Sequence, residues 1–182
     1  SSIVPTALSE AAAQVADVQV RNRGTIGGSL AHSDPAADLP AALVALKGQI
    51  ITSSTNEHRT IESNEFFQDL FTTSLREDEI ISEIFVPSES NGTGSAYVKF
   101  ANKASHYAIV GVAASVTIAG GKCTEASIGI TGAGPAAYQA SASVSDLIGS
   151  NLDNAAIEKA SAKAGEGVEF NDDVHASGEY RA

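Results

Sequence analysis

The chain has 182 residues, with no methionine, no tryptophan and a single cysteine, Cys123. One cysteine cannot form an intramolecular disulfide, and it excludes a metal site built from several cysteines. No stretch approaches the roughly 18 apolar residues that a membrane-spanning helix needs. The amino-terminal residues also lack the basic-then-apolar order of a secretory signal. We therefore expect a cytoplasmic protein without a membrane span.

Basic residues are also scarce: 11 Lys and Arg stand against 22 Asp and Glu, a net charge of −11. Such an acidic chain is a poor partner for nucleic acid or for an anionic membrane surface. The length suits one large domain or two small ones. Because even the initiator methionine is missing, we expect a processed start or a piece of a longer protein.

Hydrophobic periodicity and turn residues predict an α+β fold with mostly antiparallel strands. The polar, glycine-containing stretch 88–95 predicts a boundary between a domain at 1–90 and a domain at 95–182. Gly120 and Gly121 predict a hairpin turn. We expect helices at 6–16, 35–46, 65–70, 144–148 and 154–164, and strands at 17–23, 49–54, 78–87, 96–100, 109–119 and 122–131.

The stretch "RNRGTIGGSLAHSDPAADLP" (21–40) joins small polar residues to an apolar segment. The amides of Gly27 and Gly28 can approach an anion closely, and Thr25 and Ser29 add hydroxyl donors, a chemistry that suits a pyrophosphate. The spacing alone favours a simple turn between a strand and a helix. The stretch fits neither the GxGxxG pattern of dinucleotide-binding folds nor the GK[ST] of P-loops.

Other polar residues allow both functional and structural interpretations. Asp38 is our preferred ligand contact, whereas Asp34, before a proline, suits a helix cap. His32 lies in the glycine-containing stretch and is a weaker candidate contact. The histidines show no metal-binding spacing, and no GxSxG motif supports hydrolase chemistry. Lys99 is either an exposed strand lysine or a cation beside a ligand.

The segment "VRNRGTIGGSLAHSDPAADLPAAL" closely resembles the second FAD-binding motif in the medium subunit of molybdenum-containing hydroxylases, the carbon monoxide dehydrogenase and xanthine dehydrogenase family. The stretches "DEIISEIFVP", "AYVKFANKASHYAIVGVAASV" and "DVHASGEYRA" are similar to the family in the same order. The resemblance implies the second part of a p-cresol methylhydroxylase-type FAD-binding domain in residues 1–90. It implies a small α/β carboxy-terminal domain with an antiparallel sheet in residues 95–182.

The resemblance also implies an electron-transfer subunit of an oxidoreductase, which passes electrons from iron–sulphur clusters through FAD to an external acceptor. The implied partners are a large subunit with the molybdenum cofactor and a small iron–sulphur subunit. Neither a catalytic residue nor a metal ligand is implied in this chain. The implied FAD contacts are the phosphate-cradling residues Thr25, Ile26, Gly27, Gly28 and Ser29, with His32, Asp38, Ile81 against the flavin ring and Lys99 near its polar edge.

The family has an earlier glycine-rich loop, of the form Ala-Gly-Gly-Thr/His, and nothing before Ser9 matches it. We therefore expect a carboxy-terminal fragment that lacks the first FAD-binding subdomain and is inactive alone. The alternative is a non-catalytic assembly or interaction fragment with an incomplete flavin site. The resemblance leaves open the substrate of the holoenzyme, which the large subunit selects, and the electron acceptor.

Overall fold

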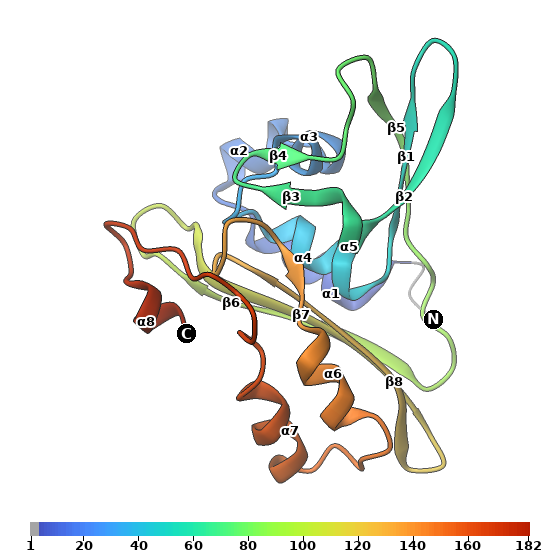
Figure 1. The fold of residues 1–182 in the computed structure, drawn as a ribbon, viewed down its shortest axis with the longest axis vertical. Coiled ribbons are helices and arrows are strands. Elements are labelled where there is room, and N and C mark those ends of the chain that lie inside the picture. Colours follow the sequence, from blue (N-terminus) through green and yellow to red (C-terminus); the bar gives the residue numbers. More distant parts are fainter. Residues whose placement is uncertain (1–3) are drawn as a thin grey trace.

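The chain begins with four short helices and continues into a small antiparallel sheet (Figure 1). The structure, a computed structural model, describes residues 4–182, so residues 1–3 of the first predicted domain lie outside the described residues. The strand order of this sheet is β2-β1-β5. The elements of this part are α1 (Thr6–Gln14), α2 (Val18–Arg23), α3 (Ile26–His32), α4 (Asp38–Ala45), β1 (Gln49–Ser53), β2 (His58–Glu62), α5 (Ser63–Phe66), β3 (Phe67–Asp69), β4 (Thr72–Thr73) and β5 (Ile80–Phe85).

The second part of the chain is built on a larger antiparallel sheet of order β6-β7-β8-β9. Gly120 and Gly121 both have positive φ, 59° and 76°, so the predicted glycine hairpin joins its two longest strands. The elements of this part are β6 (Thr93–Ala101), β7 (Ala108–Ala119), β8 (Lys122–Thr131), β9 (Tyr138–Gln139), α6 (Ser141–Leu147), α7 (Asn154–Ser161) and α8 (Gly178–Arg181).

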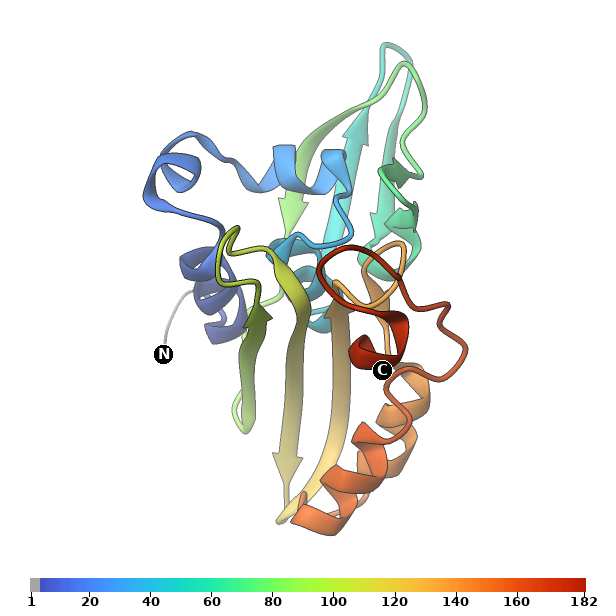
Figure 2. The same cartoon turned by 90° about the vertical axis from the view of Figure 1, so that its left-hand side faces the viewer.

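Helices cover both faces of the larger sheet (Figure 2). On one face, α1 and α4 pack against Tyr97 and Ala113. On the other face, α6 and α7 pack against Cys123 and Ala126. Successive residues of a strand point to opposite faces, so the alternation in β7 and β8 allows both helical layers. The two parts of the chain therefore share a core, and their division into two domains stays a prediction.

Helix α4 is the centre of this shared core, because all eight of its residues are buried. It lies close to β8: a Cβ on Gly129 would stand 2.1 Å from the carbonyl oxygen of Ala41. Only a glycine permits an approach this close between a helix backbone and a strand. The amino-terminal end of α4 is thereby placed over the carboxy-terminal end of β8.

The mixture of helices and antiparallel sheets confirms the predicted fold class, but the local prediction for residues 17–23 is wrong. This segment is the helix α2, in which Asp17 accepts a hydrogen bond from the amide of Val20. The carboxylate cap favours a helix start over the strand that alternating Val18 and Val20 suggested. The predicted helix at 65–70 is also displaced, since the helix α5 spans Ser63–Phe66 and residues 67–69 form β3.

Candidate functional site

The glycine pair lies inside the first turn of α3 rather than in a loop. The hydroxyl of Thr25 caps this helix, because its Oγ1 accepts a hydrogen bond from the amide of Gly28 at 3.0 Å. Among the residues that the structure describes, the amides of Ile26 and Gly27 have no hydrogen-bond partner. Free amides at a helix start attract negative charge, so this turn has the chemistry of an anion site.

Gly27 occupies a position where the fold does not require a glycine. Its φ is not positive, and a Cβ built on it would meet nothing within 4 Å. A glycine inside a helix costs roughly 1 kcal/mol relative to alanine, so the sequence keeps a residue that weakens α3. Gly28 differs, because a Cβ there would stand 3.0 Å from the capping Oγ1 of Thr25. Gly27 therefore leaves an open surface beside free amides.

The connection from α3 to α4 is fastened to the end of β8. Thr131 donates its hydroxyl hydrogen to the carbonyl groups of Pro35 and Ala37, with oxygen–oxygen distances of 2.7 and 2.8 Å. The amide of Gly132 also donates to the carbonyl of Pro35, at 2.6 Å. Asp34 is not a cap of α4, since its carboxylate accepts from the nearby amide of Ala36. Residues 34–38 are consequently a fixed segment.

Asp38, at the start of α4, lies in a buried polar cluster with two residues of β6. Tyr97 donates its hydroxyl hydrogen to Oδ1 of Asp38, and Lys99 donates from Nζ to Oδ2 at 2.9 Å. Lys99 also donates to the carbonyl of Gln14, the last residue of α1, at 2.7 Å. The side chains of Asp38 and Lys99 are only 5% and 3% exposed. Each oxygen of the carboxylate therefore already has a protein partner.

The charges of this cluster respond to their burial. Burial raises the pKa of the Asp38 carboxyl above its ordinary value, and the hydrogen bonds from Tyr97 and Lys99 oppose this rise. Burial, together with the negative charge of Asp38, also raises the pKa of the Tyr97 hydroxyl. Tyr97 consequently stays a neutral donor, which is the form that its bond to Asp38 requires.

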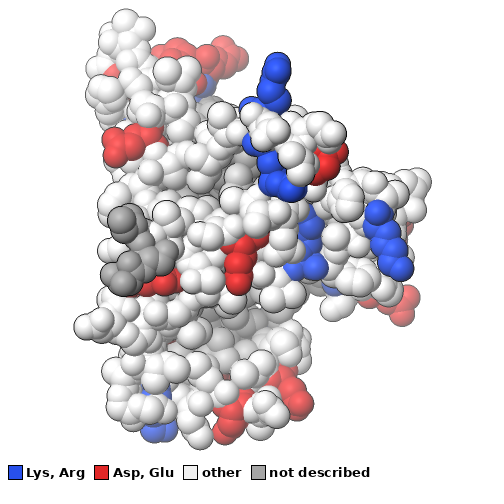
Figure 3. All heavy atoms as spheres, turned by 180° about the vertical axis from the view of Figure 1, so that it is seen from behind, with Lys and Arg blue, Asp and Glu red and all other residues white. Residues whose placement is uncertain are grey.

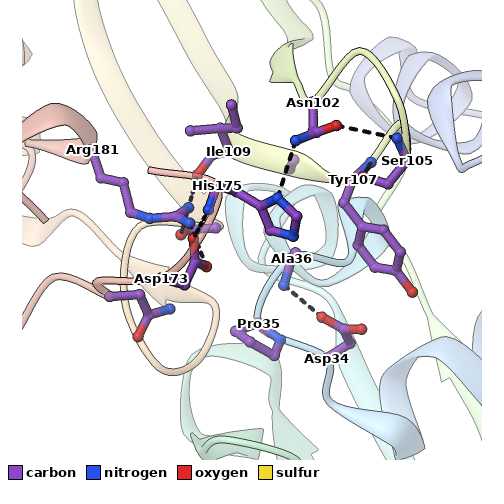
Figure 4. Close-up of a pocket in the computed structure, with 13 residues that line it drawn as sticks. Asp34, Pro35, Ala36, Asn102, Ser105, Tyr107, Ile109, Asp173, His175 and Arg181 are labelled. Atoms are coloured by element: carbon purple, nitrogen blue, oxygen red, sulfur yellow. Dashed lines mark hydrogen bonds and ion pairs between the residues drawn. The ribbon is translucent and has the colours of Figure 1, made fainter. Parts of the chain in front are cut away.

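A pocket of about 370 Å³ opens next to the fixed segment, between residues 34–36, the 102–109 region and the carboxy-terminal tail (Figure 4). Tyr107 lies above Asp34, whose negative charge raises the pKa of the Tyr107 hydroxyl. On the other side, Arg181 donates to the carbonyl groups of Ile109 and Gly132 at 2.6 and 2.8 Å. Arg181, from the closing sequence motif, therefore links the start of β7 to the residue that follows β8. At this end of β8, Thr131 and Gly132 donate to the carbonyl of Pro35.

The structure brings Thr25, Ile26, Gly27, Gly28 and Ser29 together in the first turn of α3. His32 lies at the opposite end of that helix, exposed, with its ring 5.0 Å from the ring of Phe71. Ile81 on β5 is half-buried against the core cluster that contains Leu30. The charged groups of Asp38 and Lys99 bind each other and are not exposed to solvent. The direct cofactor contacts predicted for these residues stay predictions.

Sequence reasoning missed Tyr97 and Thr131, whose hydroxyl groups donate from the larger sheet to residues 35–38. The only signal was the placement of small residues on β7, where Gly111 leaves room for the Tyr97 ring. Within residues 4–182 no cluster of His, Cys, Asp and Glu could hold a metal ion, and no helix is long and apolar enough to cross a bilayer.

Two family patterns match the chain. The family described as "FAD binding domain in molybdopterin dehydrogenase" matches residues 3–89. The family described as "CO dehydrogenase flavoprotein C-terminal domain" matches residues 95–182.

Characterised relatives match almost the whole chain. The 6-hydroxypseudooxynicotine dehydrogenase complex subunit alpha of Paenarthrobacter nicotinovorans is 41% identical over 96% of this chain and 60% of its own length. The carbon monoxide dehydrogenase medium chain of Hydrogenophaga pseudoflava is 34% identical over 96% of this chain and 61% of its own. The chain thus spans about three fifths of the length of these relatives.

Solved structures agree with the sequence matches. A carbon monoxide dehydrogenase structure from Hydrogenophaga pseudoflava superposes with a TM-score of 0.91 at 36% identity, over 95% of this chain and 60% of that one. Quinoline 2-oxidoreductase from Pseudomonas putida 86 gives a TM-score of 0.83 at 31% identity, over 93% of this chain and 59% of that one. The sequence resemblance and the predicted fold are confirmed, and the chain belongs to the family of FAD-binding medium subunits of molybdenum hydroxylases, which includes the carbon monoxide dehydrogenase medium chains.

Proposed function

We propose that the first turn of α3 binds the phosphates of FAD. The observation that carries this proposal is Gly27, a helix-weakening residue that has open space around it and unpartnered amides beside it. Backbone amides at a helix start, free of a nearby side chain, suit a pyrophosphate. The hydroxyl of Ser29 adds a donor, and Thr25 keeps the turn in shape through its cap. The residues present therefore fit the cofactor.

The remaining predicted contacts complete the proposed site. Ile81 offers an apolar surface on the edge strand β5, in keeping with the flat face of a flavin. His32 supplies an exposed polar ring at the end of α3. We propose that Asp38 and Lys99 lie close to the cofactor, although their side chains bond to each other.

FAD, when bound, supplies the redox chemistry of such a subunit, accepting and releasing electrons. The chain contributes binding and orientation, and no residue of it serves as a catalytic acid or base in our proposal. We propose that electrons arrive from a small iron–sulphur subunit and leave to an external acceptor. A large molybdenum subunit oxidises the substrate. These assignments rest on relatives named as medium or complex subunits, and cytoplasmic location stays a prediction.

Titration of the 182-residue chain with FAD, followed by fluorescence quenching, tests the proposal. Riboflavin, which lacks both the phosphates and the adenosine, and FMN, which adds a single phosphate to riboflavin, are the control ligands. If amides of α3 hold the pyrophosphate, riboflavin binds at least about tenfold more weakly than FAD, a difference of about 1.4 kcal/mol. Equal affinities for riboflavin and FAD, or no binding of either, would contradict the proposal. We expect the chain alone to bind FAD weakly and to be inactive in substrate oxidation.

An assembly role is the second candidate, and the surface of α2 favours it. Val18 and Val20 are 59% and 47% exposed, and α2 buries none of its residues. Figure 3 shows large areas of the rear face without charged side chains, and α2 itself also carries Arg21 and Arg23. Exposed apolar groups that gather into a contiguous patch are typical of a contact with another protein. Reconstitution with the molybdenum and iron–sulphur subunits separates the two: joining the complex without a flavin spectrum would support assembly alone.

A further inference from the structure

Two cross-strand rows of the larger sheet, which are neighbours on the face towards α4, carry most of the side-chain hydrogen bonds to residues 35–38. In one row, Lys99 on β6, Gly111 on β7 and Thr131 on β8 lie opposite one another. In the next row, Tyr97, Ala113 and Gly129 do the same. Residues in register across a sheet point to the same face, so both rows face α4. The sheet presents a short platform of donors and small residues to the start of that helix.

The platform supplies donors to two carbonyl groups and to the carboxylate of the segment. Thr131 serves the carbonyl groups of Pro35 and Ala37. Lys99 and Tyr97 each serve one oxygen of Asp38. These acceptors belong to the segment that follows α3, so their fixation also limits how α3 can turn relative to α4. A buried acceptor that loses its donor destabilises the folded chain, so other arrangements of this segment are disfavoured.

Gly111, in the middle of the platform, has no side chain, and the Tyr97 ring occupies the space that a side chain there would fill. A Cβ on Gly111 would stand 2.2 Å from the hydroxyl oxygen of Tyr97 and 2.9 Å from Cγ2 of Thr131. Tyr97 is 3% exposed and Thr131 is fully buried. Neither side chain can therefore touch a ligand that approaches α3 from outside. Any effect of these two residues on a cofactor acts through the segment that they hold.

We propose that Tyr97, Lys99 and Thr131 are positioning residues for the cofactor site. They hold residues 35–38 on the carboxy-terminal sheet and thereby fix the direction of α3 and its free amides. The inference rests on the proposed function, because it assigns the second part of the chain a role in FAD affinity. It gives Asp38 and Lys99 an indirect role besides the contact expected from the sequence.

Two nearly isosteric variants test the inference in the full chain. Thr131→Val and Tyr97→Phe each remove one hydroxyl without removing a side chain. The control, Ser143→Ala, removes a buried hydroxyl that donates at 2.7 Å to Ala160, between α6 and α7. Hydrogen exchange at the amides of Ala36 and Ala37 reports on the segment, and FAD titration reports on the site.

We expect both platform variants to speed exchange at Ala36 and Ala37 roughly three- to tenfold, as the loss of one buried hydrogen bond implies. FAD affinity falls by a similar factor, and the Ser143→Ala control changes neither readout. Unchanged exchange, unchanged FAD affinity, or an equal loss in the control would each overturn the inference. If the unaltered chain does not bind FAD, the proposed function itself has failed, and the cofactor role of the platform fails with it.

Discussion

Asp38 and Lys99 form a buried ion pair across the two parts of the chain, with Nζ 2.9 Å from the carboxylate, although the two residues are 61 positions apart in sequence. The pair links the start of α4 to β6, and Lys99 extends the link to the end of α1 through Gln14. Both residues were expected at the cofactor from the sequence. Their mutual contact makes the relative placement of helix and sheet depend on charge.

Removing one partner of this pair will cost more than removing both. Lys99→Met leaves a buried carboxylate with Tyr97 as its only side-chain donor, and we expect a loss of about 3–5 kcal/mol in the free energy of unfolding. The double variant Asp38→Leu with Lys99→Met leaves no unpaired charge, so it should be more stable than Lys99→Met alone. Urea denaturation of the two single variants and the double variant measures this. Strictly additive losses would show that the residues act independently.

The cap of α3 can be tested without adding bulk. Thr25→Ala removes the oxygen that accepts from the amide of Gly28, and we expect a loss of about 1 kcal/mol in unfolding free energy. Thr25→Ser keeps a capping hydroxyl and should lie within a few tenths of a kcal/mol of the unaltered chain. Thermal unfolding compares the three proteins. Equal destabilisation by Ala and Ser would mean that the methyl group, not the cap, matters.

We expect an ion pair near the β1–β2 hairpin to make the free energy of unfolding depend on pH in acid. Arg59 holds the pKa of the Glu79 carboxyl down at about 2, against an ordinary value of 4.5, with further bonds from Arg76 and Thr52. Since the folded pKa lies below the unfolded one, the stabilisation is complete above pH 4.5 and is lost as the pH falls towards 2.

Glu79→Gln removes this titration. Its stability should therefore fall less steeply than that of the unaltered chain between pH 4.5 and pH 2, as followed by denaturant unfolding at each pH. Parallel pH profiles for the two proteins would show that Glu79 does not contribute to this pH dependence.

The close approach of α4 to β8 predicts an intolerance at Gly129. An added Cβ would stand 2.1 Å from the carbonyl oxygen of Ala41, so Gly129→Ala must displace the helix backbone. We expect a loss of about 2 kcal/mol or more in unfolding free energy. Gly94→Ala on β6 is the matched control, because a Cβ there meets nothing within 4 Å. Similar effects of the two substitutions on thermal stability would disprove the tight packing.

The larger sheet could be predicted from the sequence because its signals are local. Alternating apolar residues from Val112 to Ile118 and the pair Gly120–Gly121 predict β7, the turn and β8 close to their observed bounds. Local signals failed where two of them compete. Val18 and Val20 alternate like a strand, yet the carboxylate of Asp17 starts a helix there.

The residues proposed for the site could be named from the sequence, but their arrangement in space could not. The glycine pair argued against a helix by propensity, and only the cap by Thr25 shows why α3 forms around it. The contact between Asp38 and Lys99 depends on how α4 packs on the sheet, and no local pattern encodes it. Tyr97 and Thr131 read as ordinary strand residues until their register is known.

Gly27→Ala tests the central claim most directly, because its two expected effects have opposite signs. The methyl group meets no atom within 4 Å and replaces a helix-weakening residue, so we expect the ligand-free chain to gain up to about 1 kcal/mol in unfolding free energy. The same methyl group stands where the cofactor phosphates approach, so FAD affinity should fall at least about tenfold while riboflavin affinity changes little. A Gly27→Ala variant that binds FAD as well as the unaltered chain does would contradict the account.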